Sequence, residues 1–150
     1  MLEIGSISHG THVSADLACA LIGAMLSEGW TEESPRIIEL RDVESGADTT
    51  TDSEVIADAM DDLDNCAPPY CYVGMHEGDG SDLGVWLSND AIEEACRDGE
   101  ILKLSDLSEI DDIAKEDLAS YHYFAVVNDH GNVSLYPVVV TYGKALWDLV

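Results

Sequence analysis

The chain has 150 residues, of which 31 are Asp or Glu and only six are Lys or Arg, so its formal net charge at pH 7 is -25. Such an acidic chain is repelled by nucleic acid and by anionic lipid, which argues against both as direct partners and favours basic proteins or multivalent cations. Apolar residues make up 46% of the chain. This content argues against a disordered acidic tail and predicts one globular domain over residues 1–150.

The first predicted helix covers residues 12–29, which are apolar nearly all round and indicate a central buried helix. Residues 36–41 fit either a short helix or a strand. The strongest helix signal covers residues 51–65, where Thr51 followed by Glu54 fits a capping box. The apolar face of this helix is formed by Val55, Ile56, Ala59, Met60 and Leu63. Two prolines then end it.

A hairpin is predicted next, with strands at 70–75 and about 83–87 joined by a polar, glycine-rich loop. The pattern then predicts a helix at 89–98 and a short strand at 101–104. An acidic amphipathic helix is predicted over 106–118. Its apolar stripe would be Leu107, Ile110, Ala114 and Leu118.

The last third is rich in β-branched and aromatic residues, which predicts a second hairpin with strands at 121–128 and 133–140. Pro137 places the second of these strands at a sheet edge or a bulge. Residues 145–150 fit one more edge strand. Together the elements predict an α+β fold, in which an antiparallel sheet of four to five strands packs against three to four helices.

Two segments carry a resemblance to known sequences. Residues 76–86, HEGDGSDLGVW, resemble a HEGDGADYGFW-like motif, and residues 126–136, VVNDHGNVSLY, resemble a VVNDHGNVTLY-like motif. Both motifs are similar to those of small uncharacterised proteins encoded by phages, prophages and plasmids. The resemblance implies an origin in a mobile element, and it transfers no catalytic residues to this chain.

Two acidic segments suggest mimicry of the DNA backbone. Carboxylates four residues apart on a helix are separated by about 6 Å along its axis, close to the phosphate spacing of one strand. The candidate partner-binding residues are Asp52, Glu54, Asp58, Asp61, Asp62 and Asp64 in the first segment, and Asp106, Glu109, Asp111, Asp112, Glu116 and Asp117 in the second. Such stripes would occupy the basic groove of a nuclease, a restriction enzyme or a CRISPR effector.

Adaptation to high salt is an alternative explanation of the charge. Asp outnumbers Glu by eighteen to thirteen, Lys is scarce, and the charge is even, with -13 over residues 1–75 and -12 over 76–150. This composition is typical of halophilic proteins. The sequence leaves both explanations open.

A metal-dependent hydrolase is a third hypothesis, because imidazole and carboxylate groups gather in the two predicted hairpin loops, 76–82 and 128–132. The candidate ligands are His76, Glu77, Asp79, Asp82, Asp129 and His130. The same loops are also good turn sequences, since Gly, Asp and Asn favour turns. The spacing is not that of an EF-hand calcium loop.

The favoured hypothesis is an anti-defence protein of the DNA-mimic type, which inhibits a basic, nucleic-acid-handling host protein without turnover. No cofactor is expected, because no phosphate-binding or nucleophile motif occurs in the chain. The four cysteines match no zinc spacing and are expected as free thiols. No secretory leader or membrane span is recognisable, so we expect a cytoplasmic protein of the host cell; a homodimer stays open.

Overall fold

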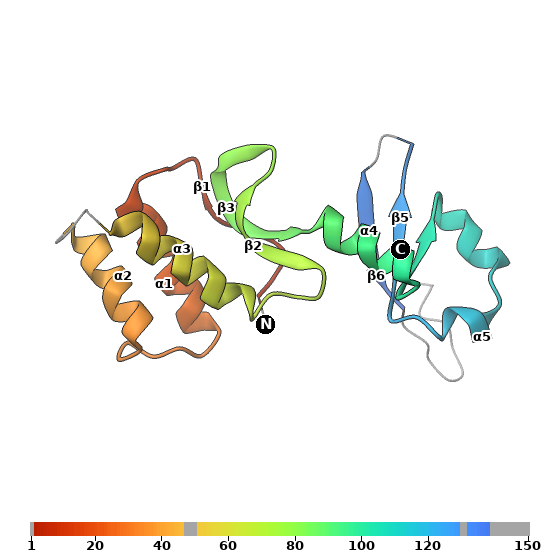
Figure 1. The fold of residues 1–150 in the computed structure, drawn as a ribbon, viewed down its shortest axis with the longest axis horizontal. Coiled ribbons are helices and arrows are strands. Elements are labelled where there is room, and N and C mark those ends of the chain that lie inside the picture. Colours follow the sequence, from red (N-terminus) through yellow and green to blue (C-terminus); the bar gives the residue numbers. More distant parts are fainter. Residues whose placement is uncertain (1, 47–50, 130–131, 139–150) are drawn as a thin grey trace. The chain divides into compact units, whose positions relative to one another are not determined.

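The computed structural model of the protein describes residues 2–46, 51–129 and 132–138 (Figure 1). The chain divides into two compact units, Met1–Ser88 and Asn89–Val150. Each unit has its own three-stranded sheet and its own helices. The predicted α+β class is therefore confirmed, although the strands form two small sheets rather than one sheet of four to five strands.

Three helices pack together in the first unit: α1 (Ser14–Ser27), α2 (Pro35–Ser45) and α3 (Asp52–Asp64). Residues 36–41, whose sequence fits either a helix or a strand, belong to helix α2. Proline occupies its first turn, where the missing N–H is not needed, and Gly46 ends it with a left-handed φ of 69°. The predicted capping box of α3 does not form, because Thr51 precedes the helix without a side-chain hydrogen bond to it.

The first unit's sheet contains β1 (Gly5–His9), β2 (Cys71–His76) and β3 (Asp79–Leu87) in the order β1-β3-β2. All of its pairings are antiparallel, and the predicted hairpin is the β2–β3 pair. Strand β1, which the sequence pattern did not predict, pairs with the other side of β3. Strand β3 is therefore central and hydrogen-bonded on both sides.

The core of the first unit lies between its helices and one face of this sheet. Leu83 and Val85 of β3 are fully buried there, against helical residues such as Leu21, Met25 and Leu63. Trp86 belongs to the opposite face, because side chains alternate along a strand. Its indole N–H donates a hydrogen bond to the carbonyl oxygen of Gly74 on β2 at 3.0 Å.

The second unit's sheet contains β4 (Ile101–Leu104), β5 (Tyr123–Val127) and β6 (Val133–Pro137) in the order β4-β5-β6. The pairing of β5 with β6 is the predicted hairpin, and Pro137 is the last residue of an edge strand. Strands β4 and β5 are parallel, which differs from the expected all-antiparallel arrangement. The strand predicted at 145–150 lies outside the described residues.

Helix α4 (Asn89–Asp98) precedes β4 and packs against it. The single helix predicted over 106–118 is wrong: the structure has a 3-10 helix, η1 (Leu107–Asp112), and a short helix, α5 (Lys115–Leu118). Residues 113 and 114 between them are extended. The expected apolar stripe lacks a partner surface along its length, since Leu107 is 47% exposed while Leu118 is buried, and a helix without a packed face is only marginally stable.

None of the helices in the described ranges combines the length and the apolar character needed to cross a membrane. All four cysteines are free thiols, and Cys19 is the most exposed of them.

Candidate functional site

Helix α3 presents a regular row of carboxylates. Glu54, Asp58, Asp61 and Asp64 are exposed, whereas Asp52 and Asp62 are half-buried. The buried residues Ile56, Ala59 and Leu63 hold the opposite face of the helix against the core. The predicted spacing of about 6 Å between carboxylates four residues apart therefore exists on a helix whose orientation is fixed by packing.

Part of this row is engaged within the protein. The guanidinium of Arg36 on α2 lies 3.1 Å from the carboxylate of Asp58 and 2.8 Å from that of Asp62. It also contacts Glu39 at 2.6 Å. The hydrogen bond to Asp62 is the main cause that raises the pKa of Arg36, followed by the opposing effect of burial and the nearby negative charges. Asp58 and Asp62 are thus held in place and partly neutralised.

The ends of the α3 row differ from its middle. The Asp64 carboxylate accepts a hydrogen bond from the Val73 amide at 2.8 Å and so ties the end of α3 to β2. One carboxylate oxygen of Asp52 is buried and has no hydrogen-bond partner among the described residues. In the described part of the chain Glu54 and Asp61 form no ion pair, which makes them the members of the row most available to a partner.

The second acidic segment has a different geometry, because it lies on η1, α5 and the turns beside them. All six of its predicted carboxylates are exposed. Two of them have local roles: Asp106 accepts from the amide and hydroxyl of Ser108, and Glu109 accepts from the Ser105 amide. The other four are Asp111, Asp112, Glu116 and Asp117, and they form no ion pair among the described residues. Without a continuous helix this segment lacks the regular spacing of α3.

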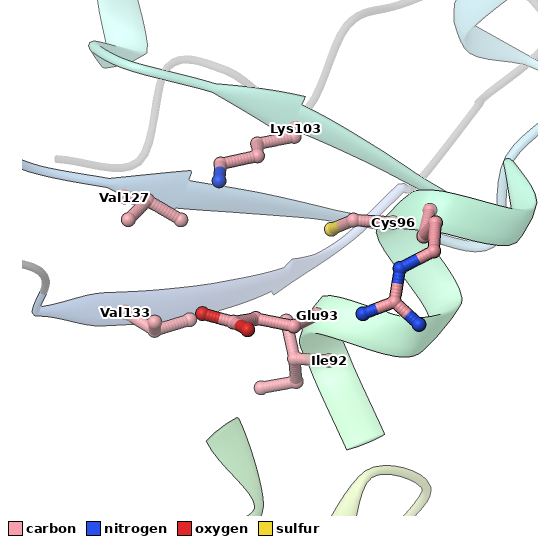
Figure 2. Close-up of a pocket in the computed structure, with 7 residues that line it drawn as sticks. Ile92, Glu93, Cys96, Lys103, Val127 and Val133 are labelled. Atoms are coloured by element: carbon pink, nitrogen blue, oxygen red, sulfur yellow. The ribbon is translucent and has the colours of Figure 1, made fainter. Parts of the chain in front are cut away.

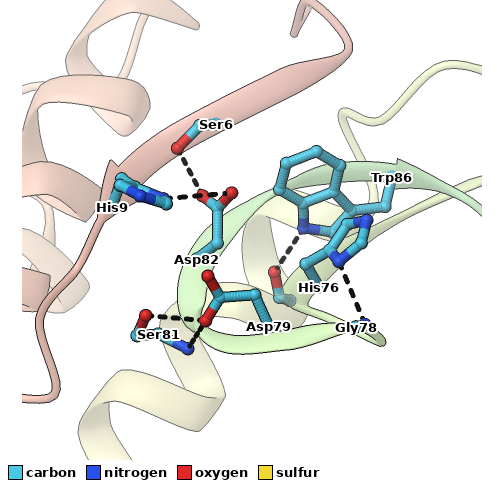
Figure 3. Close-up of polar contacts among 9 residues, drawn as sticks. Ser6, His9, His76, Gly78, Asp79, Ser81, Asp82 and Trp86 are labelled. Atoms are coloured by element: carbon cyan, nitrogen blue, oxygen red, sulfur yellow. Dashed lines mark hydrogen bonds and ion pairs between the residues drawn. The ribbon is translucent and has the colours of Figure 1, made fainter.

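The candidate metal ligands on β2 and β3 are engaged in local hydrogen bonds, as Figure 3 shows. The Asp82 carboxylate accepts from the hydroxyl of Ser6 and lies 3.3 Å from Nδ1 of His9. The Asp79 carboxylate accepts from the amide and hydroxyl of Ser81 at 3.0 and 2.7 Å. These two bonds are the main causes that lower the pKa of Asp79.

His76 is part of the same turn. Its Nδ1 accepts a hydrogen bond from the Gly78 amide at 3.0 Å, so the neutral imidazole carries its proton on Nε2. Its ring packs edge-on against Trp86 with 4.7 Å between the ring centres (Figure 3). The Nδ1 lone pair and the ring contact with Trp86 thus both help to fix the hairpin.

Of the remaining candidate ligands, Glu77 is exposed in the turn between β2 and β3 of the first unit. Asp129 follows β5, and His130 is not among the described residues. Within the described ranges, no three His, Cys, Asp or Glu side chains are grouped as metal ligands. The convergence of the two loops on a metal stays a prediction.

Sequence reasoning missed the cations that organise the acidic surface. Arg41 on α2 lies 3.0 Å from Glu32 and 2.8 Å from Glu44, and hydrogen bonds to these two carboxylates raise its pKa further. Arg36 likewise forms ion pairs with carboxylates of α3. Each arginine and its i+3 glutamate are visible in the sequence, but the contacts with Asp58 and Asp62 depend on how α2 and α3 pack.

Sequence reasoning also missed a pocket in the second unit. It is lined by α4 and by the sheet (Figure 2), and its lining residues include Arg97 and Lys103. The only sequence signal for it is the scarcity of bases, two of which lie six residues apart on either side of the turn before β4.

Comparison with known proteins gave no match: no protein-family model, no curated protein and no solved structure is significantly similar to the chain.

Proposed function

We propose that the protein is an inhibitor that binds a basic, nucleic-acid-handling protein by mimicking the charge of DNA. The proposal includes the mobile-element origin that the sequence motifs imply, and thus a role against a host defence nuclease. Basic surfaces of the partner would take up the exposed carboxylates of α3 and, separately, those of the 106–117 segment. Binding would block these surfaces without any chemical step.

The observation that carries the proposal is the imbalance of charge at the surface. The only ion pairs of Arg or Lys within the described ranges belong to Arg36 and Arg41, and together these engage five carboxylates: Glu32, Glu39, Glu44, Asp58 and Asp62. Within these ranges, few carboxylates besides those five can therefore be neutralised by Arg or Lys, and the surface is strongly acidic. Ten of the twelve predicted partner-binding carboxylates are exposed, so the field that they create reaches the solvent.

The geometry of α3 adds a second support. A DNA-binding groove places its Lys and Arg side chains to meet phosphates at regular intervals. Carboxylates on α3 are held at similar intervals by a packed helix and by Arg36, so little conformational entropy is lost when a partner binds. Complementary charge would also accelerate the encounter with such a groove.

The test compares two variants that carry the same change in net charge. The site variant combines Glu54→Lys, Asp61→Lys, Asp111→Lys and Glu116→Lys. The control variant combines Glu3→Lys, Glu33→Lys, Asp42→Lys and Glu94→Lys, which are exposed positions outside the two acidic segments. Each protein is added to a DNA-cleavage assay with a restriction endonuclease or a CRISPR effector that the wild-type chain inhibits.

We expect the site variant to lose inhibition by at least about tenfold and the control variant to lose much less, because close charge pairs dominate such interfaces. Thermal unfolding of both variants checks that they fold. Equal loss in the two variants would point to net charge alone, and unchanged inhibition in the site variant would overturn the proposed surface.

Adaptation to high salt is the second candidate, and the even distribution of charge over both halves of the chain favours it. In that case the carboxylates hold water and cations at the surface and need no protein partner. Its distinguishing property is a fold that requires molar salt.

A further inference from the structure

The second unit contains a pocket of about 320 Å³ between α4 and one face of its sheet (Figure 2). Lys103 pairs with Ala125 in the parallel β4–β5 ladder, and Val127 pairs with Val133 in the antiparallel β5–β6 ladder. Because side chains alternate along each strand, Lys103, Val127 and Val133 lie on the same face. Helix α4 crosses that face and closes the pocket with residues one turn apart, such as Ile92 and Cys96.

The charge of this pocket is opposite to that of the protein. Two of its lining residues are cations, Arg97 and Lys103, and one, Glu93, is an acid. In the first unit, by contrast, Arg36 and Arg41 are both surrounded by carboxylates. In the described residues neither Arg97 nor Lys103 forms an ion pair, so both keep their hydrogen-bond donors available to a ligand.

The other walls of the pocket are apolar. Ile92 is 1% exposed, and Val127 and Val133 are half-buried. Burial raises the pKa of the Cys96 thiol, while the nearby charge of Lys103 lowers it by less and that of Glu93 raises it. The thiol is therefore protonated at neutral pH and acts as a small apolar group instead of a nucleophile.

From this combination we propose that the pocket is a binding site for a small organic monoanion, a carboxylate attached to a short apolar chain. The carboxylate would contact Arg97 and Lys103, and the apolar chain would lie against Ile92, Val127 and Val133. Glu93 favours a ligand with a single negative charge, because a carboxylate in the pocket lining disfavours a second negative charge beside it. The pocket volume matches the lower end of ligand pockets, which are concave and mostly apolar with a few polar groups.

The first test uses hexanoate as the probe and hexanamide as its neutral analogue of the same shape. Each is titrated into the full-length ¹⁵N-labelled protein, and amide chemical shifts are followed. We expect hexanoate to bind with an affinity in the millimolar range and to shift the amides of Cys96, Lys103, Val127 and Val133. Hexanamide should bind at least about fivefold more weakly, since it lacks the charge that pairs with the two cations.

Inorganic phosphate distinguishes an amphipathic site from a simple anion site. It should bind more weakly than hexanoate, because it lacks the apolar chain and carries more negative charge near Glu93. Equal binding of hexanoate and hexanamide, tighter binding of phosphate, or no shift at these amides with any probe would each overturn the proposal.

Variants then assign the contacts. Lys103→Gln and Arg97→Gln should each lower the affinity for hexanoate by up to about fivefold. Glu93→Gln should raise this affinity by up to about threefold. The matched control is Lys115→Gln, which removes the same charge from the same unit at an exposed position that does not line the pocket. It should change the affinity by less than about 1.5-fold. A control effect as large as that of Lys103→Gln would contradict a defined site.

Discussion

The guanidinium of Arg36 on α2 donates a hydrogen bond from Nε to the carboxylate of Asp62 on α3 at 2.8 Å. The same side chain is 20% exposed and also contacts Glu39 and Asp58. One cation therefore gathers three carboxylates from two helices. In a protein with so few bases, this cluster offsets repulsion at the place where α2 and α3 pack.

Replacing Arg36 tests this role. Arg36→Gln leaves three carboxylates close together without a cation, so we expect the free energy of unfolding to fall by about 1–3 kcal/mol at low salt. The loss should shrink as salt screens the repulsion. Chemical denaturation at two NaCl concentrations measures both effects. Arg41→Gln is the control: its side chain is 45% exposed, and we expect a much smaller loss than in Arg36→Gln. A loss in Arg41→Gln as large as that in Arg36→Gln would contradict this account.

Salt separates the two explanations of the overall charge. Between about 20 mM and 3 M NaCl the Debye length falls from roughly 20 Å to below 3 Å. We expect the protein to be folded at the lowest concentration, because both arginine clusters and a continuous core hold the first unit together. Thermal unfolding followed by circular dichroism gives the answer. A chain that folds only in molar salt would favour halophilic adaptation and weaken the case for mimicry.

Asp106 gives a prediction about pH. Hydrogen bonds from the hydroxyl and the amide of Ser108 lower the pKa of this carboxyl from its ordinary value of 3.8. Because the pKa of Asp106 is lower in the folded state, the ionised side chain stabilises η1 fully at pH values above its ordinary pKa. This stabilisation is lost as the pH falls through the lowered pKa. The Ser108 amide shift should therefore titrate with a midpoint below 3.8.

The Asp106→Asn variant is the control for that titration, because its side chain does not ionise and the Ser108 amide should no longer follow the same curve. A midpoint at or above 3.8 in the wild-type chain would show that the cap does not form in solution.

Gly84 on β3 tests the packing of the first sheet. A Cβ atom at this position would lie 2.4 Å from the carbonyl oxygen of Gly5 on β1 and 2.5 Å from the indole of Trp86. Gly84→Ala therefore clashes with both β1 and the indole, and we expect it to destabilise the protein by about 2 kcal/mol or more. Gly80→Ala, on the same strand with open space around its Cβ, should change stability by less than about 1 kcal/mol. Chemical denaturation of the two variants under identical conditions measures both free energies of unfolding. Similar losses in the two variants would refute the close approach of β1.

Elements with a strong local pattern were predictable from the sequence. The apolar face of α3 and the strands of the β2–β3 hairpin follow from residues a few positions apart, and both are present. The segment 106–118 has a helical pattern as well, yet it forms two short helices because no neighbouring surface buries the whole stripe. Periodicity thus predicts a helix only where tertiary structure provides a partner for the apolar face.

Features that depend on distant contacts were not predictable. Strand β1 has a single large apolar residue, Ile7, and becomes a strand because β3 provides its hydrogen bonds. The exposure of the carboxylates followed from their chemistry, but the contact of Arg36 with Asp62, 26 residues away, depends on how two helices pack. The pocket likewise requires α4 and three strands to come together, which no local motif encodes.

The position of β1 has a consequence for the order in which the first unit folds. Ser6 pairs with Gly84, so closing this contact requires nearly the whole unit to be synthesised, whereas β2 and β3 are neighbours in the sequence. Contacts between distant residues form late, because the entropy of closing a long loop must be overcome first. We therefore expect β1 to join this sheet last, although it precedes β2 and β3 in the chain, and until then one edge of β3 is open to other chains.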